Sequence, residues 1–313
     1  MTALSGLPSS QATGFNDEIH LAVGGVVMRI TAQDPALALT LPGATGRFAV
    51  PPADPDIRVE AHWDTLDVPQ PDTLPSRLLF DAGGLWTLHE SGGRFIFTFT
   101  SPRFGSTPYK RAEFTPDFST GTVRLHRPYF DPGEPVYPLE YPLDEIVMTN
   151  WLALGRGVEV HACAVADADG SGYLFAGHSG AGKTTIARTW MQEPGVTILS
   201  DDRVILRMRS GGVWMYGTPW HGDEPLAATA AVPLTRGFFL RQAPENQHVP
   251  LRRADIVARL LARSFPPFFS ARALDFTLSL LDDVSQLAPF GELACRPDAS
   301  VLDVIRAQSR ASK

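Results

Sequence analysis

Apolar and polar positions alternate with a period of two through much of the first half of the chain. Apolar residues flank Ser91-Gly92-Gly93 at alternate positions, namely Trp86, Leu88, Phe95, Phe97 and Phe99. Alternation interrupted by a glycine-rich turn predicts a β-hairpin. Residues 19–30 and 122–128 are expected to form further strands. The segments 51–59 and 129–142 are rich in proline, which removes a ladder donor, and are expected to be surface connections.

The pattern changes after Pro142. Apolar residues in 143–154 recur at helical spacing, with Gly155 as a stop signal, so a helix is predicted there. Residues 157–165 alternate and 172–177 form a short apolar run, which predicts two strands. Further along, we expect a helix at 184–192, a strand with its extension at 196–209, a strand at 211–220, and mainly helical segments at 254–265, 274–284 and 300–308. Strands interleaved with helices indicate an α/β domain.

The second apolar run leads into the sequence G-x-x-x-x-G-K-T, which predicts a phosphate-binding loop. Glycines allow several backbone N–H groups to approach a phosphate, and the helix that follows points its positive end at the same place. Lys183 is expected to reach the β- and γ-phosphates of ATP, and the Thr184 hydroxyl to bind Mg²⁺. The residues expected to contact the nucleotide are Gly177, His178, Ser179, Gly180, Ala181, Gly182, Lys183, Thr184 and Thr185.

Two carboxylates follow this loop, where an apolar strand is expected to end. Asp201 can hold the metal ion, and Asp202 can take a proton from an attacking hydroxyl. His161 lies on the strand before the loop strand, where a histidine is more often structural than catalytic. Cys163 is two residues further on, but neighbouring positions on one strand seldom form a nucleophilic pair.

Composition narrows the class of protein. The chain has 313 residues, a formal net charge of -7 and two cysteines without metal-ligand spacing. This charge disfavours a nucleic-acid partner, and the cysteines suggest neither a disulfide framework nor a zinc site. We find no secretory signal and no apolar run long enough to span a membrane, so a cytoplasmic protein without a membrane partner is expected.

Three segments together resemble a known family, at residues 160–165, 177–184 and 199–204. They are similar to the catalytic domain of HPr kinase/phosphorylase, a bacterial protein-serine kinase related to phosphoenolpyruvate carboxykinases. His161 precedes Gly177 by 16 residues and Asp202 follows Thr184 by 18, both close to the family spacing. The resemblance implies a mixed-sheet P-loop kinase domain over 142–313, with Asp202 as base, His161 tuning its charge and Lys183 neutralising the transferred group.

The remainder of the chain departs from this pattern. In place of the family's later acidic segment stands Gly217–Leu226, which looks like the loop of related proteins in peptide-modifying gene clusters, including kinases similar to those of lasso-peptide precursors. Asp223 or Glu224 would then be the missing metal ligand, and Trp220 or His221 a substrate contact. A plain surface turn rich in Pro and Gly is the alternative.

The expected function is transfer of the ATP γ-phosphate to a Ser, Thr or terminal hydroxyl of a small protein or ribosomally made peptide. A carboxykinase-like phosphotransferase for small metabolites and a non-enzymatic, nucleotide-gated adaptor are the alternatives. The β-rich domain over 1–141 is expected either to present an acceptor peptide along a strand edge or to serve as scaffold or homo-oligomer contact. The aromatic segment 264–270 is expected to be core.

Overall fold

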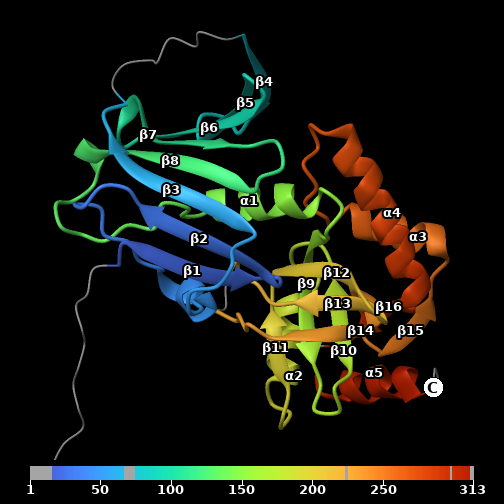
Figure 1. Ribbon diagram of the computed structural model, residues 1–313. Coiled ribbons are helices and arrows are strands. Elements are labelled where there is room, and N and C mark those ends of the chain that lie inside the picture. Colours follow the sequence, from blue (N-terminus) through green and yellow to red (C-terminus); the bar gives the residue numbers. More distant parts are fainter. Residues whose placement is uncertain (1–15, 67–74, 223–224, 297, 311–313) are drawn as a thin grey trace, which may run out of the picture.

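The computed structural model describes residues 16–66, 75–222, 225–296 and 298–310, and it has a mixed α/β architecture built on two sheets (Figure 1). The first sheet has the strand order β1-β2-β3-β8-β7-β6-β5-β4. Its strands are β1 (Glu18–Val23), β2 (Val26–Ala32), β3 (Ile57–Asp64), β4 (Ser76–Asp81), β5 (Trp86–Ser91), β6 (Arg94–Ser101), β7 (Gly105–Phe114) and β8 (Thr120–His126). No helix within the described residues is both long and apolar enough to cross a membrane.

The first sheet confirms the predicted hairpin and corrects one predicted loop. β5 and β6 pair antiparallel across Gly92-Gly93, as the alternation indicated. The segment 51–59, expected as a connection, already contains the start of β3 at Ile57. Only its proline-containing part is a loop; beyond Pro55 the chain alternates between buried Ile57 and Val59 and exposed Arg58, which is the pattern of a half-buried strand.

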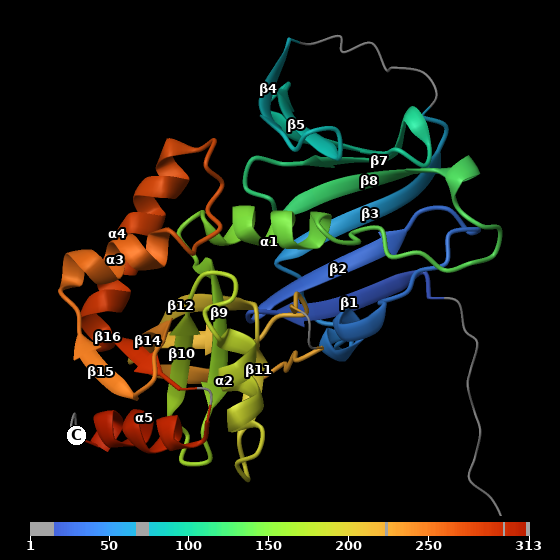
Figure 2. The ribbon, with the colours of Figure 1, turned by 180° about the vertical axis from the view of Figure 1, so that it is seen from behind.

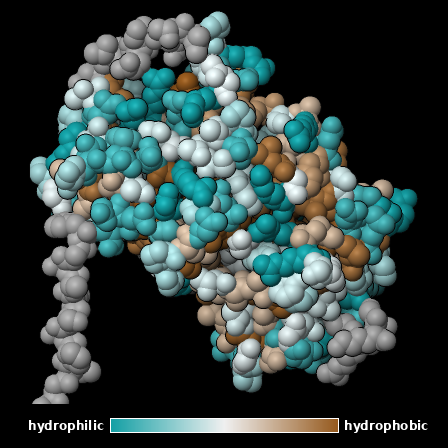
Figure 3. Space-filling view, viewed as in Figure 1, coloured by the Kyte–Doolittle hydropathy of each residue, from teal (hydrophilic) through white to brown (hydrophobic). Residues whose placement is uncertain are grey.

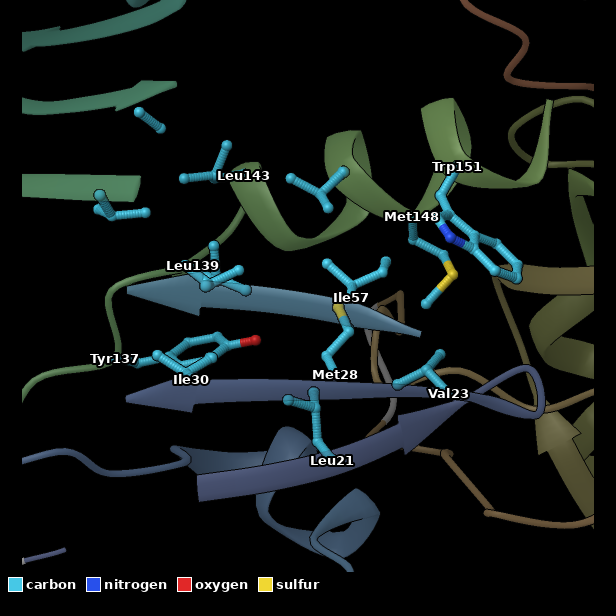
Figure 4. Close-up of a cluster of buried hydrophobic side chains, with 14 of the residues drawn as sticks. Leu21, Val23, Met28, Ile30, Ile57, Tyr137, Leu139, Leu143, Met148 and Trp151 are labelled. Carbon is cyan, nitrogen blue, oxygen red and sulfur yellow. The ribbon is translucent and has the colours of Figure 1, made fainter. Parts of the chain in front are cut away.

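Helix α1 (Leu143–Leu152) covers one face of the first sheet and confirms the helical spacing seen after Pro142. Figure 4 shows Leu143, Met148 and Trp151 of α1 beside the strands that carry Met28 and Ile57. All five side chains belong to one buried cluster. This burial of apolar surface, rather than helix propensity, holds α1 in place.

The second sheet carries the phosphate loop and is mixed. β10 pairs antiparallel with β9 but parallel with β14, and β14 is parallel with β16. The strands are β9 (Val158–Ala166), β10 (Gly172–Ala176), β11 (Thr197–Ser200), β12 (Arg203–Arg209), β13 (Gly212–Tyr216), β14 (Ala231–Gln242), β15 (Gln247–Pro250) and β16 (Phe290–Cys295). Sequence patterns predicted β9, β10 and β13 but missed β14, β15 and β16.

Helices cover both faces of the second sheet. α2 (Lys183–Trp190) and α5 (Ser300–Arg310) pack on one face, and α3 (Arg253–Leu261) and α4 (Ala271–Leu287) on the other. Figures 1 and 2 show these layers from opposite sides. The expected strand at 196–209 is divided, because β11 and β12 pair with β9 on either side of a turn at Asp201-Asp202. The two aspartates therefore lie between two strands, not after one.

The two sheets share buried apolar contacts. Ile205, Tyr216 and Trp220 belong to the same core cluster as the first sheet and α1. The guanidinium of Arg207 donates to the carbonyl oxygen of Gly24 at 2.8 Å. Gly24 has φ +62°, and a Cβ there would lie 2.8 Å from Ile205 Cδ1, so this turn needs glycine on both counts. The domain boundary expected after residue 141 stays a prediction.

Candidate active site

The phosphate loop lies between β10 and α2, as the sequence predicted for a P-loop. Gly180 and Gly182 have φ +80° and +106°, which favours glycine, and a Cβ on Gly177 would approach Ala181 Cβ to 2.6 Å. Lys183 begins the helix with its side chain buried, and its Nζ donates to the carbonyl oxygens of Gly177 at 3.1 Å and His178 at 3.4 Å. Burial lowers the pKa of Lys183. The geometry suits an anion that would take over these contacts.

Beside the loop is a cavity of about 420 Å³. One wall comes from the loop and α2, and the other from the ends of β14 and β16; the lining residues are Ala181, Gly182, Thr185, Ile186, Thr189, Gln242, Ala243, Cys295 and Arg296. Gln242 Nε2 also donates to Gly180 O at 2.7 Å. Sequence reasoning included Thr185 but missed Gln242, Cys295 and Arg296, because the strands that carry them were not predicted.

His161 and Asp202 meet in the structure. His161 Nε2 lies 2.8 Å from Asp202 Oδ1, and Arg203 Nη1 is hydrogen-bonded to Asp202 Oδ2. β9 pairs with β12 so that His161 is opposite Arg203, which explains the meeting across 41 residues of sequence. Burial by itself would raise the pKa of Asp202, but the hydrogen bond with His161 and the charges of Arg203 and Lys183 lower it. Asp202 is therefore held as a carboxylate beside the phosphate loop.

Arg203 connects this carboxylate to α1. Its Nε lies 2.7 Å from Glu145 Oε1 and 3.4 Å from Glu159 Oε1, and its guanidinium carbon lies 4.3 Å from the Phe265 ring centre. Glu159 is buried, and burial raises its pKa well above the usual value. The sequence did not predict that Glu145, Glu159 and Phe265 contact Arg203. A local signal existed for Glu159, a charged residue within an apolar strand, whereas Glu145 reaches Arg203 only through the packing of α1.

Asp201 is buried with 2% of its surface exposed. Its Oδ1 accepts a hydrogen bond from Gly222 N at 3.1 Å, whereas its Oδ2 is buried without a hydrogen-bond partner. Burial raises the pKa of this carboxyl group. A buried carboxylate oxygen without a partner suits a bound cation, and the Thr184 hydroxyl is the other predicted ligand.

The rest of the predicted metal set is not assembled in the described part of the chain. Among those residues no group of three or more His, Cys, Asp or Glu side chains is placed to hold a metal ion. Asp223 and Glu224 lie outside the described residues.

Cys163 is buried on β9, and burial raises the pKa of its thiol. The thiol stays protonated near neutral pH, which counts against a Cys/His nucleophile.

A second cavity, of about 290 Å³, adjoins Asp202 at the junction of the two sheets. The first half of the chain and the predicted substrate loop both line it, through Pro42, Thr45, Tyr137, Glu140, Tyr141, Asp144, Asp202, Arg203, Pro219, Trp220 and His221. Trp220 is buried and His221 exposed. The two predicted substrate contacts, Trp220 and His221, therefore lie at the same cavity as the candidate base.

The aromatic segment 264–270 is not all core. Phe268 is 67% exposed, although Phe269 packs against the first core cluster. The segment forms one side of an apolar groove of about 420 Å³, whose other side includes Phe80 on β4 and Ile146 on α1. Figure 3 shows apolar side chains gathered on the surface between the first sheet and α4. The prediction that Phe268 is core was wrong, because an aromatic side chain can line a surface groove instead of packing in a core.

Residues 173–243 match the AAA domain family. The matched segment runs from β10 to β14 and includes the phosphate loop, Asp201 and Asp202. The chain thus contains a P-loop nucleotide-binding domain of a kinase-like type, consistent with a phosphotransferase that uses ATP. No curated protein matches the chain.

Proposed function

We propose that the protein is an HPr-kinase-like enzyme that transfers the γ-phosphoryl group of ATP to a Ser, Thr or terminal hydroxyl of a small protein or ribosomally made peptide. The observation that carries the proposal is the 2.8 Å contact between His161 Nε2 and Asp202 Oδ1, next to the buried Lys183 of the phosphate loop. A P-loop that only binds nucleotide has no need of a carboxylate held in its ionised form by a histidine and an arginine.

The loop residues would hold the donor. Backbone N–H groups of 177–185 and the N-terminus of α2 would bind its phosphates. The Lys183 ammonium would then donate to phosphate oxygens in place of the carbonyl oxygens of Gly177 and His178. Asp201 and Thr184 are the residues on which Mg²⁺ would bind. Bound Mg²⁺ would supply positive charge to the phosphate oxygens. The cavity beside α2 leaves about 420 Å³ for the rest of the nucleotide.

In the transfer step, the acceptor oxygen forms a bond to the γ-phosphorus while the bond from that phosphorus to the bridging oxygen breaks and ADP leaves. The acceptor's proton passes to the Asp202 carboxylate. A carboxylate with a lowered pKa is a weak base, which is sufficient because phosphoryl transfer has a loose transition state that needs little proton removal. His161 and Arg203 are positioning residues, since each binds one oxygen of Asp202.

An edge strand supports a peptide as the acceptor. β4 is the last strand of the first sheet and five of its six residues are exposed. No described strand pairs with its outer edge, which can therefore add a strand from another chain. The carboxykinase-like alternative has no comparable use for this edge. The nucleotide-gated adaptor shares the edge but not the carboxylate network, which is why chemistry must decide between the two.

The deciding experiment is incubation of the protein with Mg-ATP and Ser- or Thr-containing peptides, followed by mass spectrometry for an added phosphate. Wild-type protein should give product, and Asp202→Asn should lose about two to four powers of ten in rate while keeping its nucleotide affinity. Asp255→Asn is the matched control, because Asp255 lies in an exposed ion pair with Arg252. Tight nucleotide binding without product from any peptide would favour the adaptor.

A further inference from the structure

The cavity beside Asp202 has more carboxyl groups around it than basic side chains. Glu140, Asp144 and Asp202 line it, and Glu145 and Glu159 lie behind it around Arg203. The positive side chains nearby are already engaged by these groups: Arg203 by three of the carboxylates, and buried Lys110 by Glu140 at 3.4 Å. Burial also lowers the pKa of Lys110, which weakens its hold on a proton.

Burial makes the ionised form of Asp144 costly. This side chain is buried, and its burial, opposed by the Trp220 indole and the charge of Lys110, raises its pKa to about 7. The Tyr137 hydroxyl donates to Asp144 Oδ2 at 3.4 Å and the backbone N–H of Glu145 to Oδ1 at 2.8 Å. Tyr141 and His221, the remaining titratable groups of the cavity lining, are exposed. A cation arriving from outside would offset the cost of ionising Asp144.

The walls of the cavity are aromatic as well as acidic. Tyr137, Tyr141 and Trp220 all line it. An organic cation binds well between carboxylates and aromatic rings. The carboxylates accept its hydrogen bonds, and the faces of the rings attract its positive charge. A volume of about 290 Å³ fits one side chain rather than a large ligand.

We propose that this cavity binds the ammonium or guanidinium group of the phosphoryl acceptor, so that the acceptor is a peptide whose Ser or Thr is next to a Lys or Arg. The inference rests on the proposed function, because Asp202, which lines the cavity, would receive the proton of the neighbouring hydroxyl. The part of the chain before residue 142 then contributes directly to specificity, through Glu140.

Binding tests the inference without depending on transfer. Hexapeptides with one Ser next to Lys or Arg, and counterparts with norleucine in place of the basic residue, are titrated calorimetrically into protein saturated with Mg²⁺ and a non-hydrolysable ATP analogue. We expect the basic peptides to bind about tenfold more tightly than the norleucine peptides, the effect of one favourable charge contact. Asp144→Asn and Glu140→Gln should each remove most of this difference and leave binding of the norleucine peptides unchanged.

Glu134→Gln is the matched control, because Glu134 is exposed and precedes Glu140 on the same connection. Equal binding of basic and norleucine peptides, or no binding of either, would overturn the proposal. Binding of Mg²⁺ alone to the wild-type protein, lost in Asp144→Asn, would also overturn the proposal, because the cavity would then be a metal site. Selective binding of basic peptides without any phosphorylation would contradict the kinase and still support the cation site.

Near-ultraviolet circular dichroism confirms that each variant is folded. If Glu140→Gln is not folded, because Lys110 loses its partner, Asp144→Asn decides alone.

Discussion

Lys183 Nζ lies 3.1 Å from the carbonyl oxygen of Gly177, the residue that begins the same loop. The loop thus holds its own lysine at the place where phosphates would bind. Lys183→Ala should lower phosphoryl transfer by at least about a hundredfold, because a preorganised charge at the transition state is lost. Lys183→Met keeps most of the buried stem and should lose as much. Full activity in the methionine variant would rule out a charge-based role.

Thr184→Ala should alter metal dependence more than nucleotide binding. The backbone donors of the loop would still hold the phosphates, whereas one ligand of Mg²⁺ would be missing. We expect the Mg²⁺ concentration for half-maximal activity to rise by about tenfold. Thr149→Ala is a suitable control, since the Thr149 hydroxyl donates to Ile146 O on α1 and does not line the cavity assigned to the nucleotide. An unchanged requirement for Mg²⁺ would remove Thr184 from the metal site.

The raised pKa of Asp144 makes folding stability depend on pH. Its folded-state pKa of about 7 exceeds the ordinary value, so between about pH 4 and 7 the folded state binds more protons than the unfolded state. Stability should therefore fall as pH rises through this range, by up to roughly 4 kcal/mol from this group. Asp144→Asn should flatten that part of the urea-denaturation profile, and Glu134→Gln should not. A slope that survives in Asp144→Asn would assign it to other groups.

Gly24→Ala should destabilise the protein by about 1–3 kcal/mol, because its backbone is in the left-handed region and the new Cβ would press on Ile205 Cδ1. Gly43→Ala separates the two causes: Gly43 has φ +50°, yet a Cβ added there would meet nothing within 4 Å. Denaturation midpoints should show a larger loss for Gly24→Ala than for Gly43→Ala. Ile205→Val removes the clashing methyl group and should recover part of the difference; equal losses at the two glycines would contradict the steric cause.

Local patterns predicted the parts of the fold that local chemistry determines. The phosphate loop is set by Gly180 and Gly182, and α1 and α2 by apolar spacing, so all were found from the sequence. No element was predicted over β14 and β16, because each is a buried strand, and a short apolar run does not distinguish a buried strand from a buried helix.

The candidate site divides in the same way. Lys183 could be singled out from the phosphate-loop motif, and His161 and Asp202 from the resemblance of their spacing around that loop to the spacing in a known family. Glu145 and Asp144 could not, since they reach Arg203 and the cavity only when α1 packs between the two sheets. No residue near them in sequence signals that contact, which spans 58 positions between Glu145 and Arg203.

The apolar contacts that Ile205, Tyr216 and Trp220 make with the first sheet also limit how the chain could be re-engineered. A fragment starting at residue 142 would expose these side chains to water and would lose half of the wall around Asp202. Exchanging residues 1–141 for another domain would remove the hydrogen bond that the Arg207 guanidinium donates to Gly24 O, unless the β1–β2 turn were kept. Under the proposed function, changes to the acceptor cavity and changes to the surroundings of Asp202 would therefore be coupled.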